Sequence, residues 1–179
     1  MKIALGTAQF GLNYGISNPL GQVRTDEIKR ILSAALDAGI TVVDTASAYG
    51  SSEMNIGNSG LSPALSIVTK VSNENVHEQV INSLKNLNCE TLDAVLFHDC
   101  KLLLGGSGED YFSQLEQLKA KGIVKRIGVS VYTPKEFELL SEKFNLDLVQ
   151  APVNWLDQRF IQPEIINKLI EKNIEIHAR

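Results

Sequence analysis

Short apolar runs alternate along the chain with longer segments in which apolar residues recur at helical spacing. Seven such runs begin near Ile3, Thr41, Ser66, Asp93, Arg126, Asp147 and Ile174. The segment between the first two runs carries a stripe that fits one face of a helix, made up of Ile28, Ile31, Leu32, Ala35 and Leu36. Strands separated by helical crossovers run parallel, with the helices outside the sheet. The pattern therefore predicts a parallel α/β fold.

Residues typical of helix ends fall at the boundaries of the helical segments. Thr133 and Glu136 have the spacing of a capping box. Asn75 and Glu78 have the same spacing, which predicts a second N-cap. Residues that readily adopt a left-handed conformation follow three of the predicted helices: Gly39, Gly122 and Asn173.

The apolar runs begin about 28 residues apart, and regular units of this size are typical of a (β/α)8 barrel. Eight such units need roughly 230 residues, and barrels of this kind carry their chemistry at the carboxyl ends of the strands. The chain has 179 residues and reaches Arg179 at the end of the seventh run. We therefore expect residues 1–179 to form a single, incomplete TIM barrel domain with about seven strands and six helices, as a fragment truncated after the seventh strand.

Composition and charge exclude several classes of partner. The chain is 44% hydrophobic and 21% charged, and its net charge is -4 with Lys and Arg scattered along it. A nucleic-acid partner is not expected, since such proteins carry basic patches or stripes. No apolar run reaches the roughly 18 residues of a membrane span, and no signal peptide pattern precedes the first run. We predict a cytoplasmic protein in which Cys89 and Cys100 are free thiols.

Several of the apolar runs end in a polar side chain, and the ends of parallel strands meet at one rim of the sheet. These side chains are Asp44, Lys70, His98, Ser130 and Gln150, and Tyr49 follows Asp44 by five residues. An unperturbed phenol has a pKa of about 10, so it is a poor proton donor or acceptor at neutral pH. A nearby ammonium lowers that pKa. Asp44 would hold Lys70 charged beside Tyr49, and His98 could polarise a carbonyl oxygen.

Each of these residues taken alone has an ordinary structural explanation, such as an ion pair or a half-buried aromatic. Their convergence at consecutive strand ends favours an active site. A metal centre built from His98, Asp99, Asp44 and His177 is an alternative. It is disfavoured because Lys70 would repel a cation, so we expect no metal.

Over essentially its whole length the chain resembles the aldo-keto reductase superfamily. The resemblance is carried by Leu5-Gly6-Thr7, Asp44-Thr45-Ala46, Tyr49-Gly50, Ser52-Glu53, Gly57, Lys70, His98, Gly128-Val129-Ser130 and Gln150. It implies an NADPH-dependent oxidoreductase that reduces a small-molecule aldehyde or ketone. In this family Tyr49 would be the general acid, Lys70 would tune it, Asp44 would support Lys70, and His98 would position the carbonyl.

The resemblance also implies how the cofactor is held. Ser130 and Gln150 match positions that hold the nicotinamide carboxamide, and Arg179 falls where a residue often packs on the nicotinamide ring. Val131 stands where many members have Asn, which removes one expected contact. The family grips the phosphates of NADPH mainly with later segments, so we expect weak binding by this chain.

Two other functions fit the sequence less well. One is a non-catalytic cofactor-binding or redox-sensing module of the aldo-keto reductase type, against which the retention of all four catalytic residue types argues. The other is a metal-dependent hydrolase, since one barrel class serves many reactions. An open parallel sheet also leaves its first and last strands unpaired, which predicts self-association through these edges.

Overall fold

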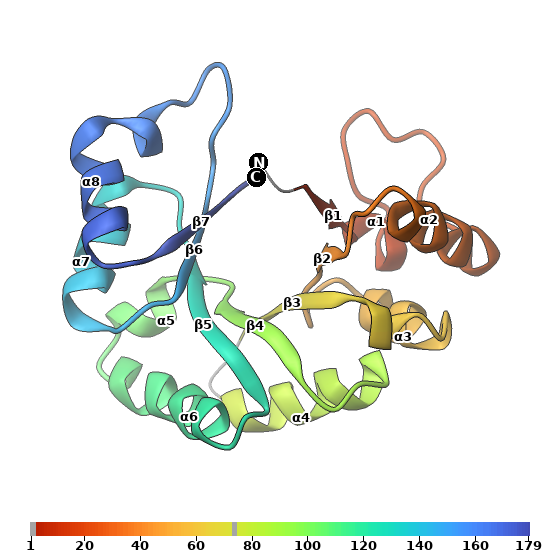
Figure 1. Cartoon of the computed structure of the whole chain (residues 1–179), viewed down its shortest axis with the longest axis horizontal. Coiled ribbons are helices and arrows are strands. Elements are labelled where there is room, and N and C mark those ends of the chain that lie inside the picture. The colour runs from red at the N-terminus through yellow and green to blue at the C-terminus, as the bar shows by residue number, and fades with distance from the viewer. Residues whose placement is uncertain (1–2, 73–74) are drawn as a thin grey trace.

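The computed structural model describes residues 3–72 and 75–179. Seven parallel strands form one sheet in chain order, and the sheet curls into part of a barrel (Figure 1). The strands are β1 (Ala4–Gly6), β2 (Val42–Asp44), β3 (Ser66–Val71), β4 (Leu92–Phe97), β5 (Val124–Ser130), β6 (Leu148–Ala151) and β7 (Glu175–Ala178). The predicted incomplete parallel barrel is therefore confirmed.

Helices lie on the outer, convex side of the curled sheet (Figure 1). The longer ones are α2 (Thr25–Asp37), α3 (Ser52–Asn58), α4 (Val76–Leu87), α6 (Gly108–Ala120), α7 (Pro134–Lys143) and α8 (Pro163–Glu171). Two short helices, α1 (Ala8–Gly11) and α5 (Lys101–Leu104), and two 3-10 turns, Ser62–Ala64 and Arg159–Ile161, are added to these. The described residues thus hold eight α-helices instead of six, because the loops after β1 and β4 each coil into an extra turn.

Most of the predicted helix boundaries are confirmed. The Glu136 N–H donates to Thr133 Oγ1 at 3.3 Å, and Glu136 Oε2 accepts from the Thr133 N–H at 2.9 Å, which completes the capping box of α7. Helix α4 does begin after Asn75, but the predicted side-chain cap is not formed there. All three residues predicted to end helices have positive φ angles: Gly39, Gly122 and Asn173.

The two faces of the sheet have different surroundings. The outward side chains of the strands pack with the helices in the main hydrophobic core, in which residues such as Val95 and Ile127 are almost completely buried. The inward side chains form a small separate cluster of Val68, Ala94, Leu96 and Leu148. Fully burying a Val, Leu or Ile side chain contributes about 1.5–3 kcal/mol to the free energy of folding, so the clusters on both faces stabilise the curved sheet. Side chains alternate between these faces along each strand.

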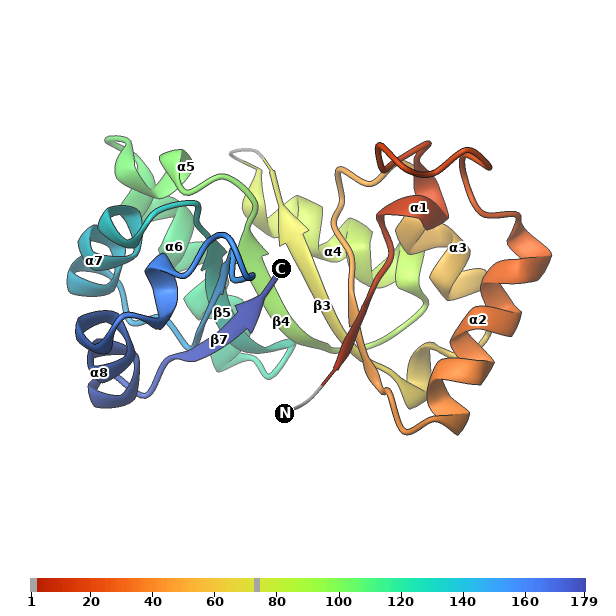
Figure 2. The same cartoon turned by 90° about the horizontal axis from the view of Figure 1, so that it is seen from above.

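Close contact between strands fixes their relative heights. Asp44 pairs with Val68, Lys70 with Leu96, and Ser130 with Gln150 in the parallel register. A Cβ on Gly128 would lie 2.3 Å from the Leu148 carbonyl oxygen, so only glycine allows β5 and β6 to approach this closely. The carboxyl ends of the strands consequently meet at one rim, which carries the short helix α5 (Figure 2).

In residues 3–72 and 75–179, no helix is long and apolar enough to cross a membrane.

Candidate active site

The inward face of the sheet leads directly to the polar side chains at its rim. Along four strands an inward apolar residue is followed two positions later by a polar one: Val42 by Asp44, Val68 by Lys70, Leu96 by His98, and Leu148 by Gln150. Because residues two apart share one face of a strand, these polar groups all point into the mouth of the curled sheet. Strand periodicity and register together therefore assemble the site.

Asp44 and Lys70 form a buried ion pair at the centre of this mouth. Lys70 Nζ lies 2.8 Å from Asp44 Oδ1 and 2.7 Å from Oδ2, and it donates a third hydrogen bond to the Thr45 carbonyl oxygen at 2.8 Å. The Lys70 side chain is only 1% exposed. Burial lowers the pKa of Lys70, and the Asp44 carboxylate opposes this change. The three hydrogen bonds replace the water that the ammonium has lost.

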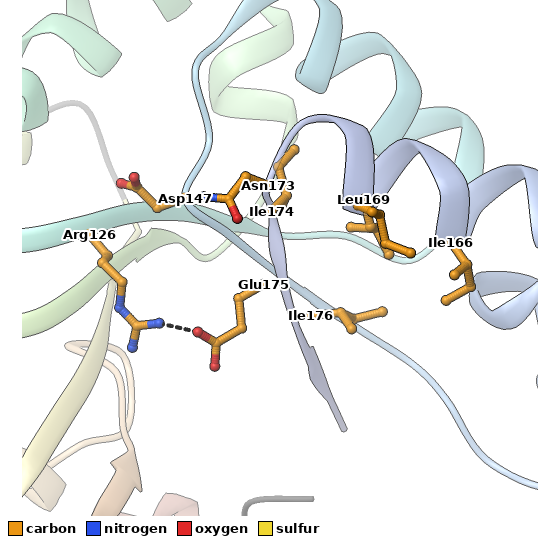
Figure 3. Close-up of a pocket in the computed structure, with 9 residues that line it drawn as sticks. Arg126, Asp147, Ile166, Leu169, Asn173, Ile174, Glu175 and Ile176 are labelled. Atoms are coloured by element: carbon orange, nitrogen blue, oxygen red, sulfur yellow. Dashed lines mark hydrogen bonds and ion pairs between the residues drawn. The ribbon is translucent and has the colours of Figure 1, made fainter.

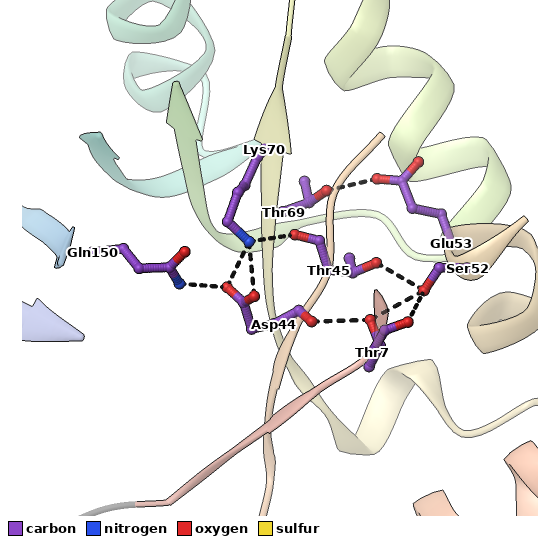
Figure 4. A network of polar contacts seen from close by, with 8 residues as sticks. All are labelled: Thr7, Asp44, Thr45, Ser52, Glu53, Thr69, Lys70 and Gln150. Carbon is purple, nitrogen blue, oxygen red and sulfur yellow. Dashed lines mark hydrogen bonds and ion pairs between the residues drawn. The ribbon is translucent and has the colours of Figure 1, made fainter. Parts of the chain in front are cut away.

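Gln150 completes the shell around the Asp44 carboxylate. Its Nε2 donates to Asp44 Oδ1 at 2.7 Å, so β6 contacts a carboxylate that lies 106 residues earlier in the chain (Figure 4). The sequence pattern predicts that both residues lie at the rim. It does not predict this hydrogen bond, because an amide at the rim could face several partners.

A second set of hydrogen bonds fixes the backbone around Asp44. Thr7 Oγ1 donates to the Asp44 carbonyl oxygen at 2.9 Å, and Ser52 Oγ donates to the Thr7 carbonyl oxygen at 2.9 Å (Figure 4). The Thr45 and Ser52 hydroxyls are 3.1 Å apart, while Thr69 Oγ1 donates to Glu53 Oε1 at 2.6 Å. This buried network joins β1, β2, β3 and α3 beneath the site. Sequence reasoning assigned it no role, although its members are polar residues next to apolar runs.

Tyr49 and His98 lie above the ion pair. The Lys70 ammonium is 5.2 Å from the centre of the Tyr49 ring, and the His98 ring stands edge-on to Tyr49 with 5.7 Å between centroids and an interplanar angle of 83°. The backbone N–H of His98 donates to the Val71 carbonyl oxygen at 2.9 Å, which extends the β3–β4 ladder by one residue. The structure thus brings together all four side chains that were predicted to be catalytic.

The electrostatics of Tyr49 differ from the prediction. Burial, and then the Asp44 carboxylate, raise the pKa of Tyr49 to about 12, whereas a lowering by Lys70 was expected. The reason is that Asp44 neutralises Lys70, which leaves burial as the dominant influence. Burial, followed by the charge of Lys70, also lowers the pKa of His98. At neutral pH the site therefore presents a protonated phenol and a neutral imidazole.

Comparison with known proteins identifies the family. The model of the Aldo/keto reductase family matches residues 2–179. The chain belongs to this family. An aldo-keto reductase from Mycobacterium marinum is 33% identical over 142 residues, which cover 74% of the chain and 49% of that relative. The chain accordingly spans about half the length of the curated relatives it matches.

Solved structures of aldo-keto reductases share the fold. A Pseudomonas aeruginosa structure assigned to the aldo-keto reductases superposes with a TM-score of 0.82 at 26% identity, over 97% of the chain and 70% of that protein. An aldo/keto reductase from Klebsiella pneumoniae, solved in complex with NADP and acetate, gives a TM-score of 0.77 at 23% identity. That alignment covers 98% of the chain and 62% of the Klebsiella protein. The recognised family resemblance is confirmed.

Three residues of this aldo-keto reductase chain were predicted to contact the cofactor. Ser130 and Gln150 lie side by side at the ends of β5 and β6 and are almost completely buried. A serine hydroxyl and a side-chain amide can each donate and accept hydrogen bonds, so these two residues could hold a carboxamide group. The Arg179 guanidinium instead lies over the Tyr132 ring, 4.3 Å from its centroid, and Nη2 donates to the Val131 carbonyl oxygen at 3.4 Å.

Among residues 3–72 and 75–179, no group of three or more His, Cys, Asp or Glu side chains is arranged to hold a metal ion.

A cavity of about 530 Å³ lies away from the candidate active site, between β7 and α8 (Figure 3). Its polar lining comes from the amino ends of the strands, where Arg126 Nη1 donates to Glu175 Oε2 at 2.6 Å. Arg126 also pairs with Asp93. Because barrel enzymes place their chemistry at the opposite ends of the strands, we assign this cavity to the stability face of the aldo-keto reductase fold.

Proposed function

We propose that this chain carries the catalytic residues of an NADPH-dependent oxidoreductase that reduces an aldehyde or ketone to an alcohol. The observation that carries the proposal is the buried Asp44–Lys70 pair beneath Tyr49, with His98 edge-on to the same phenol. The Klebsiella pneumoniae structure with bound NADP supports the choice of cofactor.

In this proposal Tyr49 supplies the proton. NADPH, when bound, supplies the hydride that reduces the carbonyl carbon. The Tyr49 hydroxyl donates its proton to the carbonyl oxygen, which completes the alcohol and leaves a phenolate. The Lys70 ammonium, held by Asp44, stabilises that phenolate as its charge develops.

His98 orients the substrate in the same scheme. Its imidazole is neutral at neutral pH, because burial and the nearby Lys70 lower its pKa. A neutral imidazole still carries one N–H group, which can donate a hydrogen bond to the carbonyl oxygen. That bond polarises the carbonyl and holds its oxygen near the Tyr49 hydroxyl.

The cofactor residues of the proposal are Ser130 and Gln150, with Arg179 at the same rim. Ser130 and Gln150 would hold the carboxamide, and both contacts are confined to the nicotinamide end of the cofactor. We therefore expect the 179-residue chain to bind NADPH weakly, which isothermal titration calorimetry measures directly. Micromolar binding would contradict this expectation.

The role of Tyr49 is tested by Tyr49→Phe, assayed by NADPH oxidation with a panel of aldehydes at the same NADPH concentration for every variant. We expect this variant to lose turnover by a factor of at least about 100, the usual scale of general acid catalysis. Tyr111→Phe, in α6 against the outer core, is the matched control and should retain activity. Unchanged turnover by Tyr49→Phe would refute the assignment. Cofactor binding without turnover of any carbonyl by the unaltered chain would favour the non-catalytic module.

A further inference from the structure

A second cavity, of about 350 Å³, lies on the outer side of the sheet between α3 and α4. Its lining combines residues 47–48, Glu53 in α3, Ser72 after β3, and one side of α4. Thr69 and Lys70 are neighbours in β3, so their side chains point to opposite faces of the sheet. Glu53 contacts Thr69, which places this cavity across the sheet from the mouth that holds Lys70. We call it the α3–α4 cavity.

Close packing of the two helices sets the positions of the cavity walls. A Cβ on Gly57 would lie 2.1 Å from the Asn86 carbonyl oxygen, so α3 and α4 contact each other through their backbones there. Glu53 precedes Gly57 by four residues, and Asn82 precedes Asn86 by four. Residues four apart lie on the same face of a helix. Glu53 therefore lines the cavity from α3, and Asn82 and Ser83 line it from α4, about one turn before that contact.

Glu53 is a buried acid without a counter-charge. The residue is only 4% exposed, and its Oε1 accepts a hydrogen bond from Thr69 Oγ1 at 2.6 Å (Figure 4). Within the part of the chain that the structure describes, Glu53 makes no ion pair, and its Oε2 accepts no hydrogen bond. Burial, and then the Glu53 carboxylate, raise the pKa of the nearby Cys89 thiol. Because an unpaired buried charge is costly, this position suits a cationic ligand.

The rest of the lining is polar and adds no positive charge. None of the described residues that line the α3–α4 cavity is Lys, Arg or His. Ser83 Oγ is buried and has no hydrogen-bond partner among the residues that the structure describes. Most buried hydroxyls are bonded, so Ser83 is a second unsatisfied group at the same cavity. Asn82 and Asn86 add side-chain carbonyl oxygens, so the lining offers several acceptors around one carboxylate.

We propose that the α3–α4 cavity binds a small alkylammonium ion, which donates hydrogen bonds to Glu53 Oε2, to Ser83 Oγ and to an Asn side-chain carbonyl oxygen. An ammonium group has three donors and no acceptor, which matches this set of oxygens. The site lies outside the candidate active site and does not depend on the proposed reductase function.

Other cations fit the α3–α4 cavity less well. A guanidinium group binds a carboxylate best through both oxygens, and Thr69 already occupies one oxygen of Glu53. A Ca²⁺ ion takes six to eight oxygen ligands, usually from several carboxylates, whereas Glu53 is the one acid among the described lining residues. The volume of about 350 Å³ also far exceeds the roughly 30 Å³ of one water molecule, so the cavity can hold the alkyl chain as well as the charge.

Binding is tested by titrating the 179-residue chain with propylammonium chloride in two-dimensional NMR spectra. Saturable shifts are expected for the amide resonances of Glu53, Asn82 and Ser83. Neither 1-propanol, which has a similar size but no charge, nor potassium chloride at the same concentration should produce them. Equal shifts with potassium chloride would assign the site to a metal ion and overturn the proposal. Absence of a saturable shift at millimolar propylammonium would overturn it as well.

Glu53→Gln removes the charge, while the new amide oxygen can still accept from Thr69. The affinity for propylammonium should fall at least about tenfold, the usual effect of losing a hydrogen bond to a charged group. Ser83→Ala should lower it about fivefold, since a neutral hydrogen bond is weaker. Glu78→Gln is the matched control, because Glu78 lies in α4, is exposed, and does not line the cavity. Unchanged affinity in Glu53→Gln would refute the proposed role of the carboxylate.

Thermal unfolding separates loss of the site from loss of the fold. Without ligand, Glu53→Gln should melt at the same temperature as the unaltered chain or higher, because it removes an unpaired buried charge. Propylammonium should raise the melting temperature of the unaltered chain and not that of Glu53→Gln, since a ligand stabilises only the state that binds it. If Glu53→Gln melts well below the unaltered chain without ligand, the carboxylate serves the fold by itself and the proposal fails.

Discussion

The Lys70 ammonium lies 5.2 Å from the centre of the Tyr49 ring, which places a buried cation beside this phenol. Asp44 holds this cation with both carboxylate oxygens. The ammonium charge is thus held in one position by the Asp44 carboxylate. A fixed charge stabilises a phenolate without reorganising at the moment of proton transfer.

Replacing Lys70 by Met should destabilise the protein strongly. The variant leaves Asp44 without its cation, and breaking a buried ion pair costs about 3–5 kcal/mol. Urea denaturation measures the change in the free energy of unfolding. Lys119→Met is the matched control, because Lys119 Nζ lies 2.7 Å from Asp147 Oδ1 in a more exposed pair. Such a pair contributes about 0–1 kcal/mol. Equal losses in the two variants would contradict the inferred burial of Lys70.

His98 should make the stability depend on pH. Burial, followed by the charge of Lys70, lowers its pKa in the folded state below the unfolded value near 6.5. Between these two pKa values the unfolded chain binds more protons than the folded chain, so stability falls as pH falls below about 6.5. His98→Gln should flatten this part of the profile in urea denaturation at a series of pH values. His77→Gln, on the exposed face of α4, should not. A steep acid profile retained in His98→Gln would assign the effect to other groups.

Gly128 should tolerate no side chain. A Cβ at this position would lie 2.3 Å from the Leu148 carbonyl oxygen and would force β5 and β6 apart. We expect Gly128→Ala to cost about 1–3 kcal/mol, the usual effect of overpacking. It should also separate Ser130 from Gln150, which the register holds side by side. Gly106→Ala is the control, since nothing lies within 4 Å of a Cβ there. Thermal unfolding of both variants measures the difference, and equal melting temperatures would contradict the argument.

The outer strands β1 and β7 each pair with one neighbour in the sheet of the described residues, which leaves one edge of each strand open. Open edges favour pairing with another chain, so we expect the chain to self-associate. Light scattering over a range of concentrations measures this. Ile176→Lys, in β7, should reduce the association, because a charge on an edge strand blocks pairing. Leu139→Lys, on the exposed part of α7, is the control. A monomer at every concentration, with cooperative melting, would contradict the prediction.

Much of the fold could be predicted because its signals are local. Apolar alternation marks the strands, helical spacing marks the crossovers, and the capping box of Thr133 and Glu136 marks the start of α7. The six longer helices were predicted, whereas α1 and α5 were not, because they are single turns with no apolar stripe long enough to recognise. The N-cap predicted at Asn75 has the expected position without the expected side-chain bond.

The sequence by itself determined which polar residues stand at the strand ends, because the period of two along a strand decides which face a side chain takes. Asp44, Lys70, His98 and Gln150 follow from that rule. Only the tertiary structure decided that Gln150 donates to Asp44, that Arg179 lies over Tyr132, and that the pKa of Tyr49 rises to about 12. These properties depend on the curvature of the sheet and on burial, which are set by contacts between residues far apart in the chain and leave no mark in local spacing.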